Sequence, residues 1–422
     1  MISLLIAPLL LQGTPVLAAP QDSLPVQAVP APTPAGDVST MDPLWEDPLK
    51  GLLKPLNDGE AWTEENLHIS WDIYFTLLYQ SATRTIEDPS TGSPYSRDAG
   101  TGRLDLGFNW TAFETPGARG EFHFLARSGG IIGQDASYNV GDAIGSMPVG
   151  PDALYWGENT SLCLAYWQQS FMNDDLIFTA GKVQPNQYIS LSQVANDETQ
   201  QFISGTFDGL DSLGSGLGTY APGVAVQASN EWVYFNAIVI DAQGGANTGF
   251  GTIDEGKWWA AAQLGYSPKA NANELKTNLA VILAGTNYGL EANSADVAQG
   301  DNTGYGFGVM FEQEIAPSVG LLLEYGSSQA PLSTIEQIAN IAVGVREPFG
   351  RRNDYFGVAL SWSKPTSAYS PQRREEQMLE TFYRIQLTES LQLTPDLQVL
   401  FQPATGDPDP VVIFGLRLRM QF

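Results

Sequence analysis

The chain is poor in the residues that catalysis and covalent cross-linking use most. Among its 422 residues there are one cysteine and two histidines. Cys163 alone cannot form a disulfide within the chain, and we interpret it as a packing residue. His68 and His123 lie beside no recognisable nucleophile motif, so a Ser–His pair has little support. We expect no catalytic residue, no metal site and no cofactor.

Basic residues are also scarce. The chain has 20 Lys and Arg against 47 Asp and Glu, which gives a formal net charge of −27. Such a chain repels nucleic-acid phosphates, so we expect no nucleic-acid partner. The acids gather in polar stretches such as 291–301 and 407–409. Solubilising charge on surface loops is the simpler interpretation, and a cell surface rich in divalent cations is the alternative.

Long apolar runs are missing beyond the N-terminus. The mean hydropathy is −0.12, and no later stretch approaches the roughly 18 apolar residues that a spanning helix needs. At the start, an apolar run from Ile2 to Leu11 precedes the small residues Ala18 and Ala19. This pattern predicts a signal peptide over residues 1–18, although the usual basic residues before the apolar run are missing. We therefore expect an exported protein.

The next part of the chain is rich in proline and alanine. Pro25, Pro30, Pro32 and Pro34 favour an extended linker over a packed element. Residues 43–56 contain enough Leu and Trp for a short docked segment or a helical turn. We expect residues 19–56 to form a Pro-rich periplasmic segment and residues 57–422 to form the main domain.

From His68 onward the sequence alternates between apolar and polar residues with a period of two, which is typical of strands with two different faces. The last segment shows this most clearly, because it alternates up to an aromatic carboxy-terminal residue. Its apolar positions are Val412, Phe414, Leu416, Leu418, Met420 and Phe422. A soluble β-sandwich also has one apolar face, but it needs other segments to complete its core. Lipid supplies that apolar partner for a membrane barrel, which must close because an unpaired edge in hydrocarbon leaves backbone groups unsatisfied.

The connections between these segments differ in length. Very short ones occur at 115–117, 229–231, 316–318 and 389–390, whereas 129–152, 184–221 and 329–354 are long and polar. Short turns on one side and long loops on the other are the plan of outer-membrane barrels. We therefore predict an all-β protein, a transmembrane antiparallel β-barrel of about 16 strands with short periplasmic turns and long extracellular loops. Its expected surroundings are outer-membrane lipid. The pattern does not specify an oligomeric state.

Two stretches resemble the carbohydrate-selective porin family typified by OprB. They are GKVQPNQYISLSQVANDETQQFISGTF at 181–207 and YRIQLTESLQLTPDLQVL at 383–400, the latter followed by the terminal GLRLRMQF. A weaker similarity extends over residues 62–422. The resemblance implies a 16-stranded outer-membrane pore that passes small-molecule sugars through a charged constriction. It also implies that the strand ending at Phe422 is read by the barrel-assembly machinery.

The polar faces of the predicted strands supply the candidate pore-lining residues. Sugar hydroxyls accept hydrogen bonds from Arg and donate them to Asp or Glu, so a wall with both charges suits a sugar. The candidates are Arg103, Asp105, Glu121, Arg127, Glu324 and Arg384. Each of them has an alternative role in ion pairs that only hold the barrel round. Arg417 and Arg419 also point inward, and residues 196–199 belong either to a loop folded into the channel or to a surface loop.

Two other functions remain open from the sequence. One is a structural barrel whose Pro-rich N-terminus tethers the cell envelope, and a peptidoglycan pull-down with and without residues 19–56 would detect it. The other is an outer-membrane barrel enzyme such as a lipase or protease, which requires a nucleophile with a positioned base. The alternation and the two porin-like stretches favour the passive pore.

Overall fold

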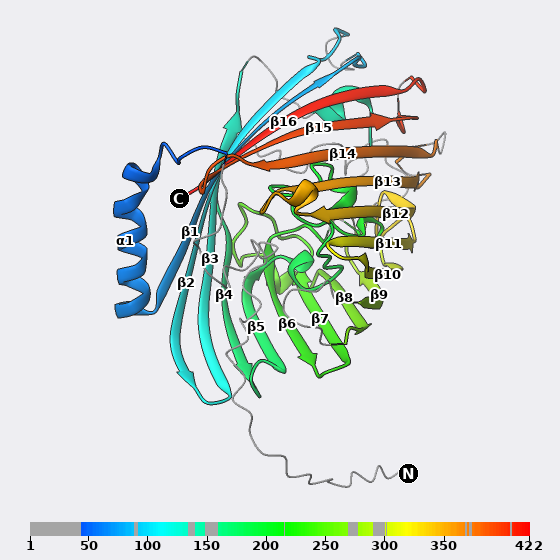
Figure 1. Ribbon diagram of the computed structural model, residues 1–422. Helices are drawn as coiled ribbons and strands as arrows, with labels where there is room; N and C mark the ends of the chain where they lie inside the picture. Colours follow the sequence, from blue (N-terminus) through cyan, green and yellow to red (C-terminus); the bar gives the residue numbers. More distant parts are fainter. Residues whose placement is uncertain are drawn as a thin grey trace, which may run out of the picture.

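The protein folds as a closed β-barrel (Figure 1). The computed structural model describes residues 44–87, 92–133, 140–147, 159–214, 216–268, 277–289, 300, 302–367, 369–370, 374–405 and 407–422, and every structural statement below concerns these residues. The predicted signal peptide and residues 19–43 lie outside them. The strands are β1 (Ile69–Ala82), β2 (Asp98–Thr115), β3 (Ala118–Ile131), β4 (Asn159–Phe171), β5 (Leu176–Val183), β6 (Ala221–Ser229), β7 (Val233–Asp241), β8 (Trp258–Tyr266), β9 (Asn278–Thr286), β10 (Gly304–Ala316), β11 (Val319–Ser328), β12 (Ile335–Arg346), β13 (Tyr355–Pro365), β14 (Glu376–Gln386), β15 (Leu391–Leu400) and β16 (Val411–Gln421).

Every strand pairs antiparallel with its neighbours in the chain, and β1 closes the ring by pairing with β16. The closing register runs from Tyr74 opposite Gln421 to Ala82 opposite Ile413. Closure lets the backbone groups of both strands pair within the sheet, as a hydrocarbon environment requires. The predicted antiparallel barrel of about 16 strands is thereby confirmed. Among the described residues, no helix is both long and apolar enough to cross a membrane.

The two faces of each strand differ in burial as the period of two predicts. On β14, inward residues are buried and alternate with partly exposed ones along the whole strand from Glu376 to Gln386. Outward positions carry exposed apolar side chains, such as Leu283 on β9 and Phe414 on β16. Inward positions of β16 carry Arg417, which is fully buried. The polar residues of the barrel therefore gather inside, which is the reverse of a soluble protein.

One expected long loop is replaced by a strand. Residues 329–354 read as a polar connection, but β12 occupies Ile335–Arg346 and pairs with β11 and β13. On this strand Ile338 and Ala342 are buried on the lumen side, while Ile341 is exposed on the outside. Apolar residues on both faces remove the alternation that identified the other strands.

The connection between β5 and β6 folds into the barrel, and we call its described residues, 184–214 and 216–220, the inner segment. Its apolar side chains Ile189, Leu210 and Leu213 are fully buried. They belong to a cluster with wall residues such as Trp259 and Ile338. The barrel thus has an apolar core between the inner segment and one side of its wall. Residues 196–199, whose place the sequence left open, lie in this internal loop.

Two α-helices lie among the described residues. The short helix α2 (Val140–Ile144) lies in the connection between β3 and β4, and its residues are mostly buried. The helix α1 (Lys50–Leu67) lies beside β1, outside the ring of strands (Figure 1). It runs across residue 57, where the sequence placed the start of the main domain, and the first strand follows its end directly.

Candidate pore constriction

Strands β2 and β3 place three charged residues together on the lumen wall. Asp105 on β2 lies directly opposite Arg127 on β3 in the strand register. Arg103 is two residues before Asp105, so both side chains point to the same face. The sequence therefore brings the three groups together by strand pairing alone, once β2 and β3 form a hairpin.

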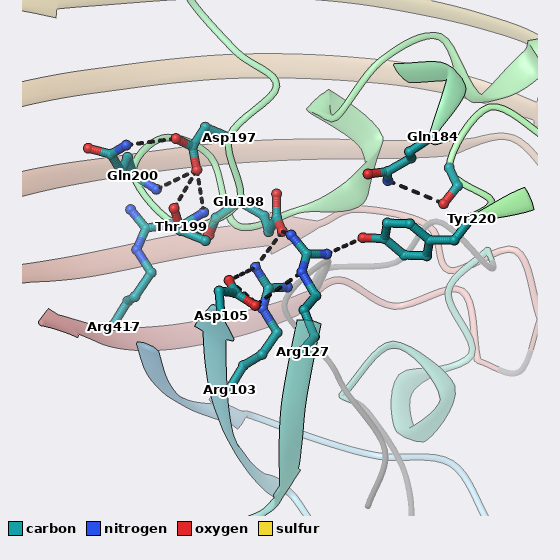
Figure 2. A network of polar contacts seen from close by, with 11 residues as sticks. Arg103, Asp105, Arg127, Gln184, Asp197, Glu198, Thr199, Gln200, Tyr220 and Arg417 are labelled. Carbon is teal, nitrogen blue, oxygen red and sulfur yellow. Dashed lines mark hydrogen bonds and ion pairs between the residues drawn. The ribbon is translucent and has the colours of Figure 1, made fainter. Parts of the chain in front are cut away.

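These residues form an ion-pair network with the tip of the inner segment (Figure 2). The Nη2 atom of Arg103 lies 3.0 Å from Oδ2 of Asp105 and 2.8 Å from Oε1 of Glu198. The Nε atom of Arg127 lies 3.0 Å from Oδ1 of Asp105, and its Nη2 lies 3.9 Å from the same Oε1 of Glu198. Arg127 also donates a hydrogen bond to the hydroxyl of Tyr220. Two guanidinium groups thus face two carboxylates, and their formal charges balance.

A tight turn in the inner segment presents Glu198 to the network. The Asp197 Oδ1 atom accepts hydrogen bonds from the backbone N–H of Thr199 and of Gln200, at 2.8 and 3.1 Å. Arg417 on β16 holds the same turn from the wall, because its Nη1 donates to the backbone carbonyls of Glu198 at 2.8 Å and Gln201 at 2.9 Å. The backbone around Glu198 is therefore fixed from both sides.

The protonation states of the loop residues suit this network. Burial opposes ionisation of Glu198, but Arg103 and then Arg127 outweigh it and hold the pKa of the Glu198 carboxyl below its ordinary value. Burial raises the pKa of the Tyr220 hydroxyl. At neutral pH Glu198 is therefore an anion, and Tyr220 keeps its proton.

Only part of the network reaches the solvent in the lumen. The side chains of Arg127 and Glu198 are each 15% exposed, whereas that of Arg103 is 1% exposed. Arg103 is thus a buried partner that holds Asp105 and Glu198 in place. Arg127 offers a hydrogen-bond donor to a passing solute, and Glu198 offers an acceptor.

The other predicted site residues lie elsewhere on the wall. Glu324 on β11 accepts hydrogen bonds from the Ser190 hydroxyl and from Asn340. Arg384 on β14 donates to the carbonyl of Gln200 at 3.3 Å. These two residues hold the inner segment. Glu121 instead lies close to Arg119, at 3.2 Å, near the short turns.

More wall groups anchor the inner segment in the same way. Glu380 on β14 accepts the backbone N–H groups of Ile203 at 2.5 Å and Ser204 at 3.1 Å. Glu312 on β10 accepts the N–H of Gln193 at 2.9 Å. The carboxylates replace backbone partners that the irregular segment cannot supply for itself, as buried polar groups require.

Sequence reasoning missed part of the network. Glu198 was named only within a loop of undecided position, and Tyr220 was not singled out. Tyr220 stands next to the start of β6 and carries no motif, so its pairing with Arg127 depends on the path of the inner segment.

Comparison with known proteins decides the family. Residues 102–422 match the family model described as "Carbohydrate-selective porin, OprB family". The chain belongs to this family. It is an outer-membrane porin for the diffusion of small solutes, and its family and fold are those of a channel rather than an enzyme. The short-turn end of the barrel is therefore the periplasmic end.

Solved structures with low sequence identity share the fold. The high-pH structure of OprB from Pseudomonas putida is 12% identical, with 92% of this chain and 100% of that chain covered and a TM-score of 0.67. OmpF from Salmonella typhi, in complex with daunomycin, is 11% identical, with 83% and 97% covered and a TM-score of 0.51. No curated protein sequence matches the chain significantly.

Proposed function

We propose that the porin passes small neutral carbohydrates and that Arg103, Asp105, Arg127, Glu198 and Tyr220 form its constriction. The observation that carries this proposal is the ion-pair network inside the barrel, in which wall residues of β2 and β3 meet Glu198 of the inner segment. The family description, carbohydrate-selective porin, agrees with it.

The chemistry of the network suits a neutral, polyhydroxylated solute. Sugar hydroxyls exchange their hydrogen bonds with water for bonds to the guanidinium of Arg127, the carboxylate of Glu198 and the hydroxyl of Tyr220. Balanced charge avoids the strong binding that would trap a charged solute, because conduction needs weak binding at each site. Glu121, Glu324 and Arg384 contribute at a distance in this proposal, the last two by holding the inner segment.

Liposome swelling tests the proposal directly. Purified full-length protein is reconstituted, and swelling is followed in isosmotic mono-, di- and trisaccharides. We expect swelling with each small sugar, at rates that fall as the sugar grows. Liposomes that carry heat-denatured protein are the control. Absence of permeation by every sugar, from barrels shown to be assembled, would overturn the proposal.

We also propose two partners that follow from the barrel. Outer-membrane lipid covers its exposed outward apolar side chains, and the barrel-assembly machinery reads the terminal strand. The N–H of Phe422 donates to the carbonyl of Ile73 at 2.9 Å, so the last residue lies at the seam where the barrel closes. Residues 1–18 act in this proposal as the signal peptide, and residues 19–56 as the Pro-rich periplasmic segment.

A further inference from the structure

The first residues of β1 extend beyond the end of its partner β16. Pairing of β1 with β16 starts at Tyr74, whereas pairing of β1 with β2 starts at Ile69. Over residues 69–72 the register therefore joins β1 to β2 alone, because the carbonyl of Ile73 already accepts the N–H of Phe422. An unpaired strand edge at a membrane surface requires a cover. The carboxyl group of Glu60 on α1 lies beside the backbone N–H of Trp71 within this edge.

Both ends of α1 are fixed to the periplasmic rim. Before the helix, the N–H of Trp45 donates to the carbonyl of Leu387 at 3.1 Å, and Asp47 accepts the N–H of Ser390 at 3.1 Å. These contacts join the helix start to the turn between β14 and β15. At the other end His68 adopts a left-handed conformation, with φ of 57°, and β1 follows at once. The helix thus lies across the seam of the barrel.

One stripe of α1 continues the lipid-facing wall. Gly59 lies against the indole of Trp71, which is on the outward face of β1. Gly59 is preceded by Leu52 at seven residues and by Leu56 at three residues, and it is followed by Trp62 at three residues. These spacings place all three side chains on the same side of the helix as Gly59. These three side chains are 68%, 39% and 57% exposed.

The opposite side of α1 is charged. This side carries Lys50, Lys54 and Asn57, which follow one another at i, i+4 and i+7 and are all exposed. A helix with an apolar stripe, an aromatic residue within it and a charged opposite face suits the boundary between acyl chains and water.

We propose that α1 is a membrane-interface helix whose Leu52, Leu56 and Trp62 insert into the periplasmic leaflet of the outer membrane beside the seam between β1 and β16. Lipid is the occupant of this stripe because the stripe is continuous with the outward wall at Trp71. Trp110, next along that wall opposite Ile69, is likewise 40% exposed. The helix covers the free edge of β1 with Glu60 and seals it from lipid.

Spin labels on the full-length protein in liposomes test this orientation. Single cysteines are introduced by Leu52→Cys, Leu56→Cys and Trp62→Cys, with Lys50→Cys, Lys54→Cys and Asn57→Cys as matched controls on the opposite side. Native Cys163 has no exposed surface, so the unmodified protein reports its background labelling. We expect several-fold greater collision with oxygen than with a water-soluble nickel chelate on the stripe, and the reverse on the control side.

Two results would overturn the proposal. Equal access of the nickel chelate to both sides would show that the stripe lies in water. Protection of the stripe from both oxygen and nickel would show that protein, such as a second copy, covers it. If Trp62→Cys does not assemble, the labels at residues 52 and 56 carry the same comparison. The readout is independent of sugar flux.

Discussion

Arg127 and Glu198 are the charged residues through which the proposed constriction meets the lumen. Each is paired within the network, and each is 15% exposed at its side chain. The sequence placed Arg103, Asp105 and Arg127 on the polar faces of strands, and the pairing of β2 with β3 then brings their side chains together. It could not place Glu198 or Tyr220, since no periodic pattern specifies the path of an irregular segment through a lumen.

Removing one charge from the network is expected to change ion selectivity. Arg127→Gln leaves an excess negative charge and should shift the pore toward cations, whereas Glu198→Gln should shift it toward anions. A unit charge at 4 Å in water contributes about 1 kcal/mol, or about fivefold in ion occupancy. Reversal potentials in a salt gradient across planar bilayers measure the shift.

Arg346→Gln is the matched control, because Arg346 on β12 forms an ion pair outside the network. Its Nη2 atom lies 2.9 Å from Oε2 of Glu314 on β10. It should leave the reversal potential close to that of the unmodified protein. Equal shifts in all three variants, or none, would remove Arg127 and Glu198 from the constriction.

Asp211 makes the stability of the inner segment depend on pH. Burial, and then the negative charge of Glu324, raise the pKa of the Asp211 carboxyl well above 3.8. The folded protein therefore keeps this proton to higher pH than the unfolded chain does. The free energy of unfolding falls as pH rises from about 4 to the raised pKa, and does not change further above it through this group.

Asp211→Asn should remove this pH dependence, because an amide does not ionise. We expect hydrogen-exchange protection factors in residues 184–220 to fall between pH 5 and pH 9 in the unmodified protein and to fall less in the variant. Asp254→Asn, at an exposed position, is the control. The same fall in Asp211→Asn as in the unmodified protein would contradict the assignment.

At the scale of elements, the inner segment depends on carboxylates of the wall. Its backbone N–H groups at residues 203 and 204 have Glu380 as their acceptor. The packing of the inner segment also explains why the sequence did not predict the strand β12. Ile338 and Ala342 turn apolar side chains inward because the inner segment, rather than water, lies against them. The alternation predicts strands whose lumen face is wet, and it fails where that face is covered.

Glu380→Gln should loosen the inner segment, because the amide NH₂ group that replaces one carboxyl oxygen leaves a buried backbone N–H without its acceptor, which costs about 1–3 kcal/mol. A more mobile segment leaves a wider passage, so permeation of trisaccharides should rise relative to monosaccharides in liposome swelling. Glu314→Gln, at the periplasmic end of β10, is the control. An unchanged ratio in assembled Glu380→Gln barrels would show that Glu380 does not set the width of the pore.

At the scale of the whole molecule, the sequence predicted the barrel because its main determinant is local. Lipid requires an outward apolar residue at every second position, and each strand shows this alternation in its own sequence. The docking of α1 was harder to predict, since it depends on where β16 ends relative to β1.

Deletion of Phe422 should impair assembly more than transport. The residue closes the seam next to Ile73 and is proposed to form part of the assembly signal. The heat-modifiable, folded fraction in isolated outer membranes should fall, while sugar flux per folded barrel stays near that of the unmodified protein. Phe401→Ala, another partly exposed phenylalanine, is the control. Normal assembly without Phe422 would argue against this role.

The buried inner segment also constrains the order in which the protein folds. The seam joins Tyr74 to Gln421, residues near opposite ends of the chain, so its formation is the least local contact in the barrel. Once the seam has formed, residues 184–220 could reach the lumen only through an open rim. The apolar cluster of Leu210 and Leu213 takes its described strand residues from β4 to β9 and from β12, and none from β1 or β16. We infer a kinetic role for it, as a nucleus around which the open sheet curls before β1 meets β16.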